Sequence, residues 1–271
     1  RSPMSISDTA IIHSTSVIEN GATVGDACRI GPYCIVGKDV TLGNRVELKS
    51  HVVVEGWTDI GDETVIFPFS SIGHIPQDLK FGGERTKLVI GARNRIREHV
   101  TMNPGTEGGG GLTRIGDDGL FMVGVHVGHD CHIGNHVIMA NNASLGGHCI
   151  ISDNVIIGAL AGVHQFCRVG RGAMIGGLAA VVSDVIPFGT VVGKRATLEG
   201  LNLVGLKRRN AAKQDISGLR AAYKQLFFGE GALREKATAL REQSGENALI
   251  DEVLDFILSD SGRSISIPSE D

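Results

Sequence analysis

The sequence predicts a parallel β-helix followed by a small α-helical domain, and three observations support this fold class. An aliphatic residue recurs at every sixth position over most of residues 6–181. Glycine is abundant, with 38 residues, whereas aromatic residues make up only 4% of the 271-residue chain. Beyond residue 196 the apolar residues recur at spacings of three and four, which is typical of amphipathic helices.

The six-residue period defines the first domain. Its aliphatic positions run from Ile6 to Ile72, return at Ile90, and run again from Ile115 to Val181. This period is neither the 3.6 residues of a helix nor the alternation of a lone strand. It fits short strands joined by tight turns, so that three strands make a coil of about 18 residues. We expect about nine coils, which at about 4.8 Å each make a prism about 40 Å long.

A second column of mostly small residues precedes the aliphatic column by two positions and is expected to fill the corners of the prism. Cys131, Cys149 and Cys167 fall in this column one coil apart. We interpret them as small packing residues rather than as a metal or redox site. Further members of the column are Ala22, Cys28, Cys34, Val52, Ser70, Ala143, Ala161 and Ala173.

Two segments interrupt the period, residues 73–89 and 103–114, and the second contains four consecutive glycines. Long loops on a rigid solenoid often carry function. We therefore predict a β-helix domain over residues 4–195 with these two insertions, and a helical domain over residues 196–271.

Four helices are expected in the second domain, and we expect the tail after Ser259 to be frayed. The apolar spacings place these helices around residues 198–206, 216–227, 233–240 and 249–258.

Composition excludes several classes of function. The net charge of −4 is spread without acidic or basic blocks, so we expect no nucleic-acid partner. There is no signal peptide and no apolar run near the length of a membrane span, so we expect a cytoplasmic protein without stable membrane insertion.

The register also brings polar residues together. Six of the ten histidines lie between residues 126 and 164. One coil separates His129 from Gly147, and one coil separates Asp130 from His148; Gln165 lies one coil beyond Gly147. In a functional interpretation His129 is a general base, Asp130 sets its tautomer and basicity, and the Gly147 N–H stabilises an oxyanion.

Other interpretations of these polar residues remain open. The histidines could simply hydrogen-bond along the stack. A zinc site needs three convergent ligands, and His126 and His132 fall on different sides of the prism, so we expect no metal. A nucleophilic Cys–His pair lacks support because Cys131 should point inward.

Three further polar groups have both a structural and a functional interpretation. Asn141 and Asn142 are either a polar corner ladder or a substrate contact. Asp78 and Lys80 are either solvated loop charges or part of a site. Lys207-Arg208-Arg209 either complements the end of a helix dipole or clamps a diphosphate or an acidic partner.

Six motifs, which follow one another along the chain, resemble those of the UDP-N-acetylglucosamine O-acyltransferase family. The resemblance extends from about residue 6 to at least residue 230. The motifs are Gln77-Asp78-Leu79-Lys80, Arg93-Asn94-Arg95-Ile96-Arg97-Glu98, Gly128-His129-Asp130-Cys131, Ala140-Asn141-Asn142-Ala143, Val163-His164-Gln165-Phe166 and Gly205-Leu206-Lys207-Arg208-Arg209. Two departures stand out: Asn103-Pro104-Gly105 replaces a common His-Arg-Gly, and Arg195 stands near a position often held by His.

The resemblance implies a left-handed β-helix, a homotrimer with sites between neighbouring prisms, and no cofactor. It implies transfer of a 3-hydroxyacyl chain from acyl carrier protein to the 3-hydroxyl of UDP-N-acetylglucosamine. It gives His129, Asp130 and Gly147 the three roles above. It places Asp78, Lys80, His126, His148, His164 and Gln165 around sugar and acyl chain, Asn202 and Arg209 near the phosphates, and Gly177 at the acyl tail.

Three alternative functions remain. One is an N-acyltransferase of the same superfamily that acts on a UDP-amino sugar. A second is a β-helix carbonic anhydrase, which would hold zinc. The third is a trimeric structural scaffold; polar groups scattered over all faces would favour it, whereas here they cluster at one register.

Overall fold

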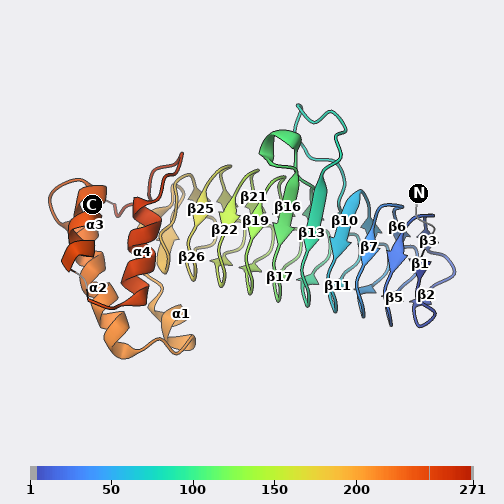
Figure 1. Ribbon diagram of the computed structural model, residues 1–271, viewed down its shortest axis with the longest axis horizontal. Coiled ribbons are helices and arrows are strands. Elements are labelled where there is room, and N and C mark those ends of the chain that lie inside the picture. Colours follow the sequence, from blue (N-terminus) through green and yellow to red (C-terminus); the bar gives the residue numbers. More distant parts are fainter. Residues whose placement is uncertain (1–4, 244, 270–271) are drawn as a thin grey trace.

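The computed structural model describes residues 5–243 and 245–269, and its main body is a three-sided β-solenoid (Figure 1). Residue 4 of the expected β-helix domain, and residues 244 and 270–271 of the expected helical domain, lie outside the described residues. Each side of the solenoid is one sheet whose strands run parallel, except for the last strand of one sheet, and a strand pairs with the strand one coil later, as Ser5 does with Thr23. The predicted fold class, a β-helix with C-terminal helices, is confirmed.

The three sheets, here called A, B and C, follow one another around each coil. Sheet A contains β1 (Ser5–Ile6), β4 (Thr23–Val24), β7 (Thr41–Leu42), β10 (Trp57–Ile60), β13 (Lys87–Ile90), β16 (Leu112–Ile115), β19 (His132–Ile133), β22 (Ile150–Ile151) and β25 (Arg168–Val169). Sheet B contains β2 (Ile11–Ile12), β5 (Arg29–Ile30), β8 (Glu47–Leu48), β11 (Val65–Ile66), β14 (Arg95–Ile96), β17 (Leu120–Phe121), β20 (Ile138–Met139), β23 (Ile156–Ile157), β26 (Met174–Ile175), β28 (Gly189–Val192) and β29 (Thr197–Leu201). Sheet C contains β3 (Val17–Ile18), β6 (Ile35–Val36), β9 (Val53–Val54), β12 (Ser71–Ile72), β15 (Thr101–Met102), β18 (His126–Val127), β21 (Ser144–Leu145), β24 (Gly162–Val163) and β27 (Ala180–Val181).

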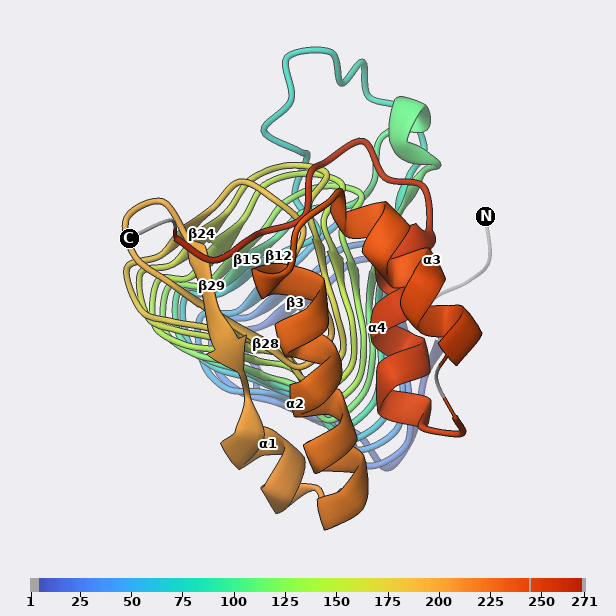
Figure 2. The same ribbon diagram turned by 90° about the vertical axis from the view of Figure 1, so that its left-hand side faces the viewer.

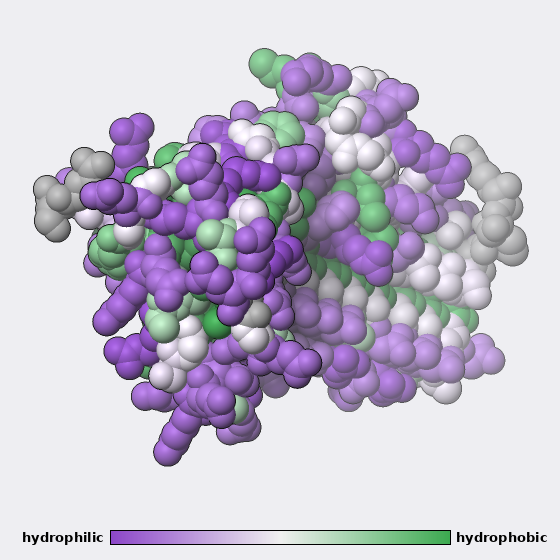
Figure 3. Space-filling model, turned by 60° about the vertical axis from the view of Figure 1, so that its left-hand side comes forward, coloured by the Kyte–Doolittle hydropathy of each residue, from purple (hydrophilic) through white to green (hydrophobic). Residues whose placement is uncertain are grey.

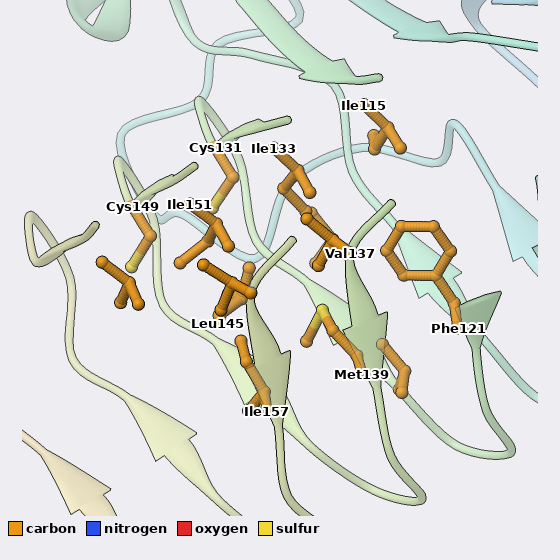
Figure 4. Close-up of a cluster of buried hydrophobic side chains, with 14 of the residues drawn as sticks. Ile115, Phe121, Cys131, Ile133, Val137, Met139, Leu145, Cys149, Ile151 and Ile157 are labelled. Atoms are coloured by element: carbon orange, nitrogen blue, oxygen red, sulfur yellow. The ribbon is translucent and has the colours of Figure 1, made fainter. Parts of the chain in front are cut away.

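The core is the interior of the prism. In a two-residue strand one side chain points outward and the next inward, so a six-residue period sends the aliphatic of every strand inside. The corner cysteines lie there too: Cys131, Cys149 and Cys167 are free and buried. Figure 4 shows Cys131 and Cys149 among the inward aliphatic side chains. Burial raises the pKa of Cys167 to about 12, which suits a packing role.

Both insertions leave the solenoid at the same kind of turn, from sheet C to sheet A. They cover residues 73–86 and 103–111, and they protrude together near β13 and β16 (Figure 1). The second contains a short 3₁₀ helix, η1 (Glu107–Gly109). Both are shorter than expected because β13 and β16 are four residues long and begin by pairing Lys87 with Leu112.

The C-terminal part begins with an antiparallel pairing of β28 and β29 and continues as α1 (Leu203–Arg208), α2 (Lys213–Phe228), α3 (Leu233–Gln243) and α4 (Ala248–Leu258). The prediction that Leu198 and Leu201 belong to the first helix is wrong, because both lie in β29. No helix in the described ranges is long and apolar enough to span a membrane.

The expectation of a frayed tail after Ser259 is also wrong. The tail returns across the end of the solenoid (Figure 2) and hydrogen-bonds to it. The Asp184 N–H donates to the Ser264 carbonyl at 2.8 Å, and the Ser266 N–H donates to the Asp184 carbonyl at 2.7 Å. These bonds fix the path of the tail beside the segment at Asp184, which continues sheet A through the bridge between Val169 and Val185.

Candidate active site

A pocket of about 590 Å³ lies where the outer face of sheet C meets the turns that lead to sheet A. We call the column of these turns the C/A corner, and name the A/B and B/C corners in the same way. The pocket is lined by Gln77, Asn103, His126, Gly128, His129, Ser144, Leu145, Gly146, Gly147, Gly162, Val163, His164, Gln165, Ala180, Val181 and Val182. In Figure 3 apolar and neutral residues form rows along the outer surface of the solenoid, beside hydrophilic ones.

His129 and Asp130 form the polar centre of the site. The His129 ring nitrogen Nδ1 lies 2.8 Å from Asp130 Oδ2, and the Asp130 side chain is fully buried. Asp130 sits in the left-handed backbone conformation (φ 58°) that the tight corner requires. A buried carboxylate accepts, so Nδ1 of a neutral His129 carries the hydrogen and Nε2 is left as a base.

The second insertion holds the Asp130 carboxylate in place. The Thr106 hydroxyl donates to Oδ2 at 2.6 Å, and the Thr106 N–H donates to Oδ1 at 2.8 Å. Gly109 packs so closely against this carboxylate that an added Cβ would overlap it. The glycine run of the insertion therefore provides close approach to Asp130.

Gly147 lies against the His129 ring, as the register predicts. A Cβ at Gly147 would be 2.5 Å from His129 Cε1, so only glycine leaves this ring in place. Within the described part of the chain, the Gly147 N–H makes no hydrogen bond. A free backbone donor next to a candidate base is the arrangement that stabilises an oxyanion.

Two more histidines, His126 and His148, lie near His129. The His148 ring meets the His129 ring edge-on at 4.9 Å and stacks on Phe166 at 4.3 Å. His126 Nδ1 lies 2.7 Å from the Thr101 hydroxyl oxygen. Burial lowers the pKa of His126 and of His148 below the ordinary value of 6.5, so both favour the neutral form.

In the first insertion Gln77 lines the pocket, whereas Asp78 and Lys80 follow it in the chain and lie outside the lining. The Lys80 N–H donates to Asp78 Oδ1 at 3.0 Å. This hydrogen bond lowers the pKa of the Asp78 carboxyl, and the charges of Lys80, His129 and His148 lower it further.

His129, Asp130 and His148 are also the one group in the described ranges with three potential metal-ligand atoms within 4.8 Å of one another. A metal would have to replace the His129–Asp130 hydrogen bond and compete with both Thr106 donors for the same carboxylate. The observed bonds therefore suit an acid–base pair better than a ligand set.

Several predicted residues lie away from this pocket. Asn141, Asn142 and Gly177 are at the B/C corner, the opposite edge of sheet C. The structure brings none of the three into the pocket of the same chain.

The predicted phosphate contacts are on and beside α1. Asn202 caps this helix by accepting from the Gly205 N–H at 2.9 Å, and it donates to the Gly172 carbonyl at 3.0 Å. Arg208 is exposed, whereas Arg209 Nη2 is buried without a hydrogen-bond partner in the described part of the chain. Neither arginine lines the pocket.

Two family models match the chain. The description "Udp N-acetylglucosamine O-acyltransferase; Domain 2" matches residues 184–266, and "Bacterial transferase hexapeptide (six repeats)" matches residues 21–56. An acyl-[acyl-carrier-protein]–UDP-N-acetylglucosamine O-acyltransferase of Paracoccus denitrificans is 62% identical over 75% of this chain and 77% of its own. The protein of the same name from Caulobacter vibrioides is 57% identical over 83% of this chain and 85% of its own. The chain belongs to the UDP-N-acetylglucosamine O-acyltransferase family.

Solved structures agree with this membership. The UDP-N-acetylglucosamine acyltransferase from Campylobacter jejuni is 39% identical, covers 95% of this chain and 100% of its own, and superposes with a TM-score of 0.89. This chain is therefore an acyltransferase that resembles a solved family structure over 95% of its length.

The sequence predicts no role for several residues that line the pocket or contact its polar groups, among them Gln77, Asn103, Thr106 and Phe166. Asn103 is buried, and its Nδ2 donates to the His74 carbonyl at 3.1 Å. Its Oδ1 has no hydrogen-bond partner in the described ranges. The departure at Asn103 was visible in the sequence, but nothing in the period placed an insertion residue in the pocket.

Proposed function

We propose that this acyltransferase moves a 3-hydroxyacyl chain from acyl carrier protein to the 3-hydroxyl of UDP-N-acetylglucosamine. The observation that carries the proposal is the proximity of three groups. The buried Asp130 carboxylate bonds to His129 Nδ1, the His129 ring lines the pocket, and Gly147, whose N–H has no partner among the described residues, lies against that ring. The curated relatives named above act on these two substrates by name.

The chemistry follows from the protonation states. A sugar hydroxyl is a weak acid, so it needs a base as it attacks the thioester carbonyl. His129 Nε2 takes the hydroxyl proton, and Asp130 stabilises the ring that gains it. The carbonyl oxygen gains negative charge and is stabilised by the Gly147 N–H. Collapse expels the thiolate, which receives the proton from His129, so no cofactor is required.

The floor of the pocket suits an alkyl chain. On sheet C the outward residues beyond His126 are Ser144, Gly162 and Ala180, all small. A Cβ at Gly162 would meet nothing within 4 Å. These small residues leave open surface along the solenoid, in the direction in which an acyl tail could extend from His129.

We infer that the working form is a homotrimer. The predicted contacts Asn141, Asn142 and Gly177 lie at the B/C corner, whereas His129 lies at the C/A corner of the same chain. The B/C corner also carries Leu160 and Leu178, whose exposed fractions are 58% and 70%. Packing the B/C corner against the C/A corner of the next copy would cover this apolar surface. It would also bring Asn141, Asn142 and Gly177 of one copy close to His129 of the next. Sedimentation velocity should report three chains; an active monomer would contradict the assembly.

His129→Ala tests the reaction. We expect kcat/KM with 3-hydroxyacyl carrier protein and UDP-N-acetylglucosamine to fall by about 100- to 10,000-fold. His132→Ala is the matched control, because His132 is exposed on sheet A of the same coil and lies outside the pocket. Near-normal turnover by His129→Ala would exclude the general-base role.

The alternatives give different results. Competition between UDP sugars with a 3-hydroxyl and a 3-amino group distinguishes O-acyl from N-acyl transfer by the mass of the product. Stoichiometric zinc bound by His129, Asp130 and His148 would favour the carbonic anhydrase. A scaffold would transfer no acyl group at all.

A further inference from the structure

The docked tail brings one arginine to the edge of the pocket. Ser261 Oγ donates to Asp184 Oδ2 at 2.6 Å, and Arg168 Nε donates to the same oxygen at 2.7 Å. Asp184 is fully buried, so this anchor is held inside the protein. The chain then passes the C/A corner, where Arg263 lies next to His164 and Gln165.

Arg263 contacts two atoms of the pocket lining. Its Nη2 lies 2.8 Å from His164 Nδ1 and 3.0 Å from the Gln165 carbonyl oxygen. A guanidinium can only donate, so His164 Nδ1 must accept and its hydrogen must be on Nε2. Arg263 thereby selects one of the two neutral tautomers of His164.

The surroundings show what would happen without Arg263. The Gln165 carbonyl oxygen also lies 3.3 Å from His164 Nδ1. An imidazole freed from Arg263 could place its hydrogen on Nδ1 and donate to this carbonyl. Nε2 would then change from a donor to an acceptor. One guanidinium bonded to both atoms prevents that exchange.

We propose that Arg263 is a positioning residue that fixes His164 as an Nε2–H donor to the substrate, and that the C-terminal tail thereby completes the active site. This inference rests on the proposed function, because it takes the pocket to be where substrate binds. It adds a contact between residues 99 positions apart.

The first experiment reads the tautomer and needs no turnover. In ¹⁵N-histidine-labelled enzyme at neutral pH, the His164 resonances are assigned by their loss in His164→Gln. We expect Nδ1 of the native protein to resonate as an unprotonated nitrogen. In Arg263→Met, which keeps the aliphatic stem, we expect a shift toward a protonated Nδ1. An unchanged His164 spectrum would overturn the proposal.

The second experiment is kinetic. We expect kcat/KM to fall about tenfold in Arg263→Met, the loss of one charge-assisted hydrogen bond. Arg263→Lys, which keeps a donor, should recover part of it. Ser264→Ala is the matched control. Among the described residues the Ser264 hydroxyl bonds only to Ser183, and the backbone bond to Asp184 remains in this variant.

A double variant separates positioning from simple docking of the tail. If Arg263 acts through His164, then Arg263→Met should cost almost nothing in a His164→Gln background. Additive losses would overturn the proposal. Failure of the proposed function would appear instead as an active His129→Ala enzyme, a result independent of the tautomer.

Discussion

The A/B and C/A corners use the same turn in opposite ways. At the A/B corner an Asp or Asn side chain accepts from the backbone N–H one coil earlier: Asn44 from Asp26 at 2.9 Å, and Asn135 from Asp117 at 2.7 Å. At the C/A corner the corresponding position above His129 is Gly147, which has no side chain. A filled corner stabilises the stack, whereas the corner that lacks a side chain leaves room for a catalytic ring and a free donor.

The largest effect should come from filling the C/A corner. Gly147→Ala places a Cβ 2.5 Å from His129 Cε1 and forces the ring to move. We expect kcat/KM to fall by about 100-fold or more, because such displacements misalign a base. The melting temperature should stay near that of the native enzyme. Full activity in this variant would contradict the role of the empty corner.

A smaller loss should follow from releasing the carboxylate that orients His129. Thr106→Val removes the hydroxyl bonded to Asp130 Oδ2 but leaves the backbone N–H bond to Oδ1. We expect about a tenfold loss of kcat at unchanged KM. Thr113→Ser provides the control, because its hydroxyl still can accept from the Asp130 N–H, a bond of 2.8 Å in the native protein.

Emptying the filled corner should change stability and leave the chemistry intact. Asn135→Ala removes the acceptor of the Asp117 N–H, and we expect the free energy of unfolding to fall by about 1 kcal/mol. Denaturant titration measures this loss, and a parallel assay should give native kcat/KM. A large kinetic defect would show that the two corners are coupled.

The smallest effect concerns pH. Burial holds the pKa of His126 and His148 below 6.5 in the folded protein, so the unfolded chain binds more protons as the pH falls through this value. Their contribution to stability is therefore present above about pH 6.5 and lost below it. Melting temperatures from pH 7.5 to 5.5 should fall, and less steeply in His126→Gln. Equal slopes would contradict the assignment.

The repeat explains why much of this comparison could be predicted. A constant coil places Gly147 over His129 without any knowledge of the turn, and the aliphatic column defines the core. Thr106 could not be found in this way, since it reaches Asp130 from an insertion whose path no period fixes. The polar tail around Arg263 resembles a frayed end in sequence, because its order depends on Asp184 in the solenoid. The division into two domains remains a prediction.

The irregular coils have an evolutionary consequence. Both insertions and the tail lie along the C/A corner, and within one chain each regular coil contacts only its neighbours along the stack. Coils distant from His129 and Gly147 are therefore expected to be interchangeable modules. We expect that whole repeats at the N-terminal end can be gained or lost by duplication or deletion with little change at the reaction centre, whereas a one-residue slip within the coils of His129 and Gly147 would separate the two residues.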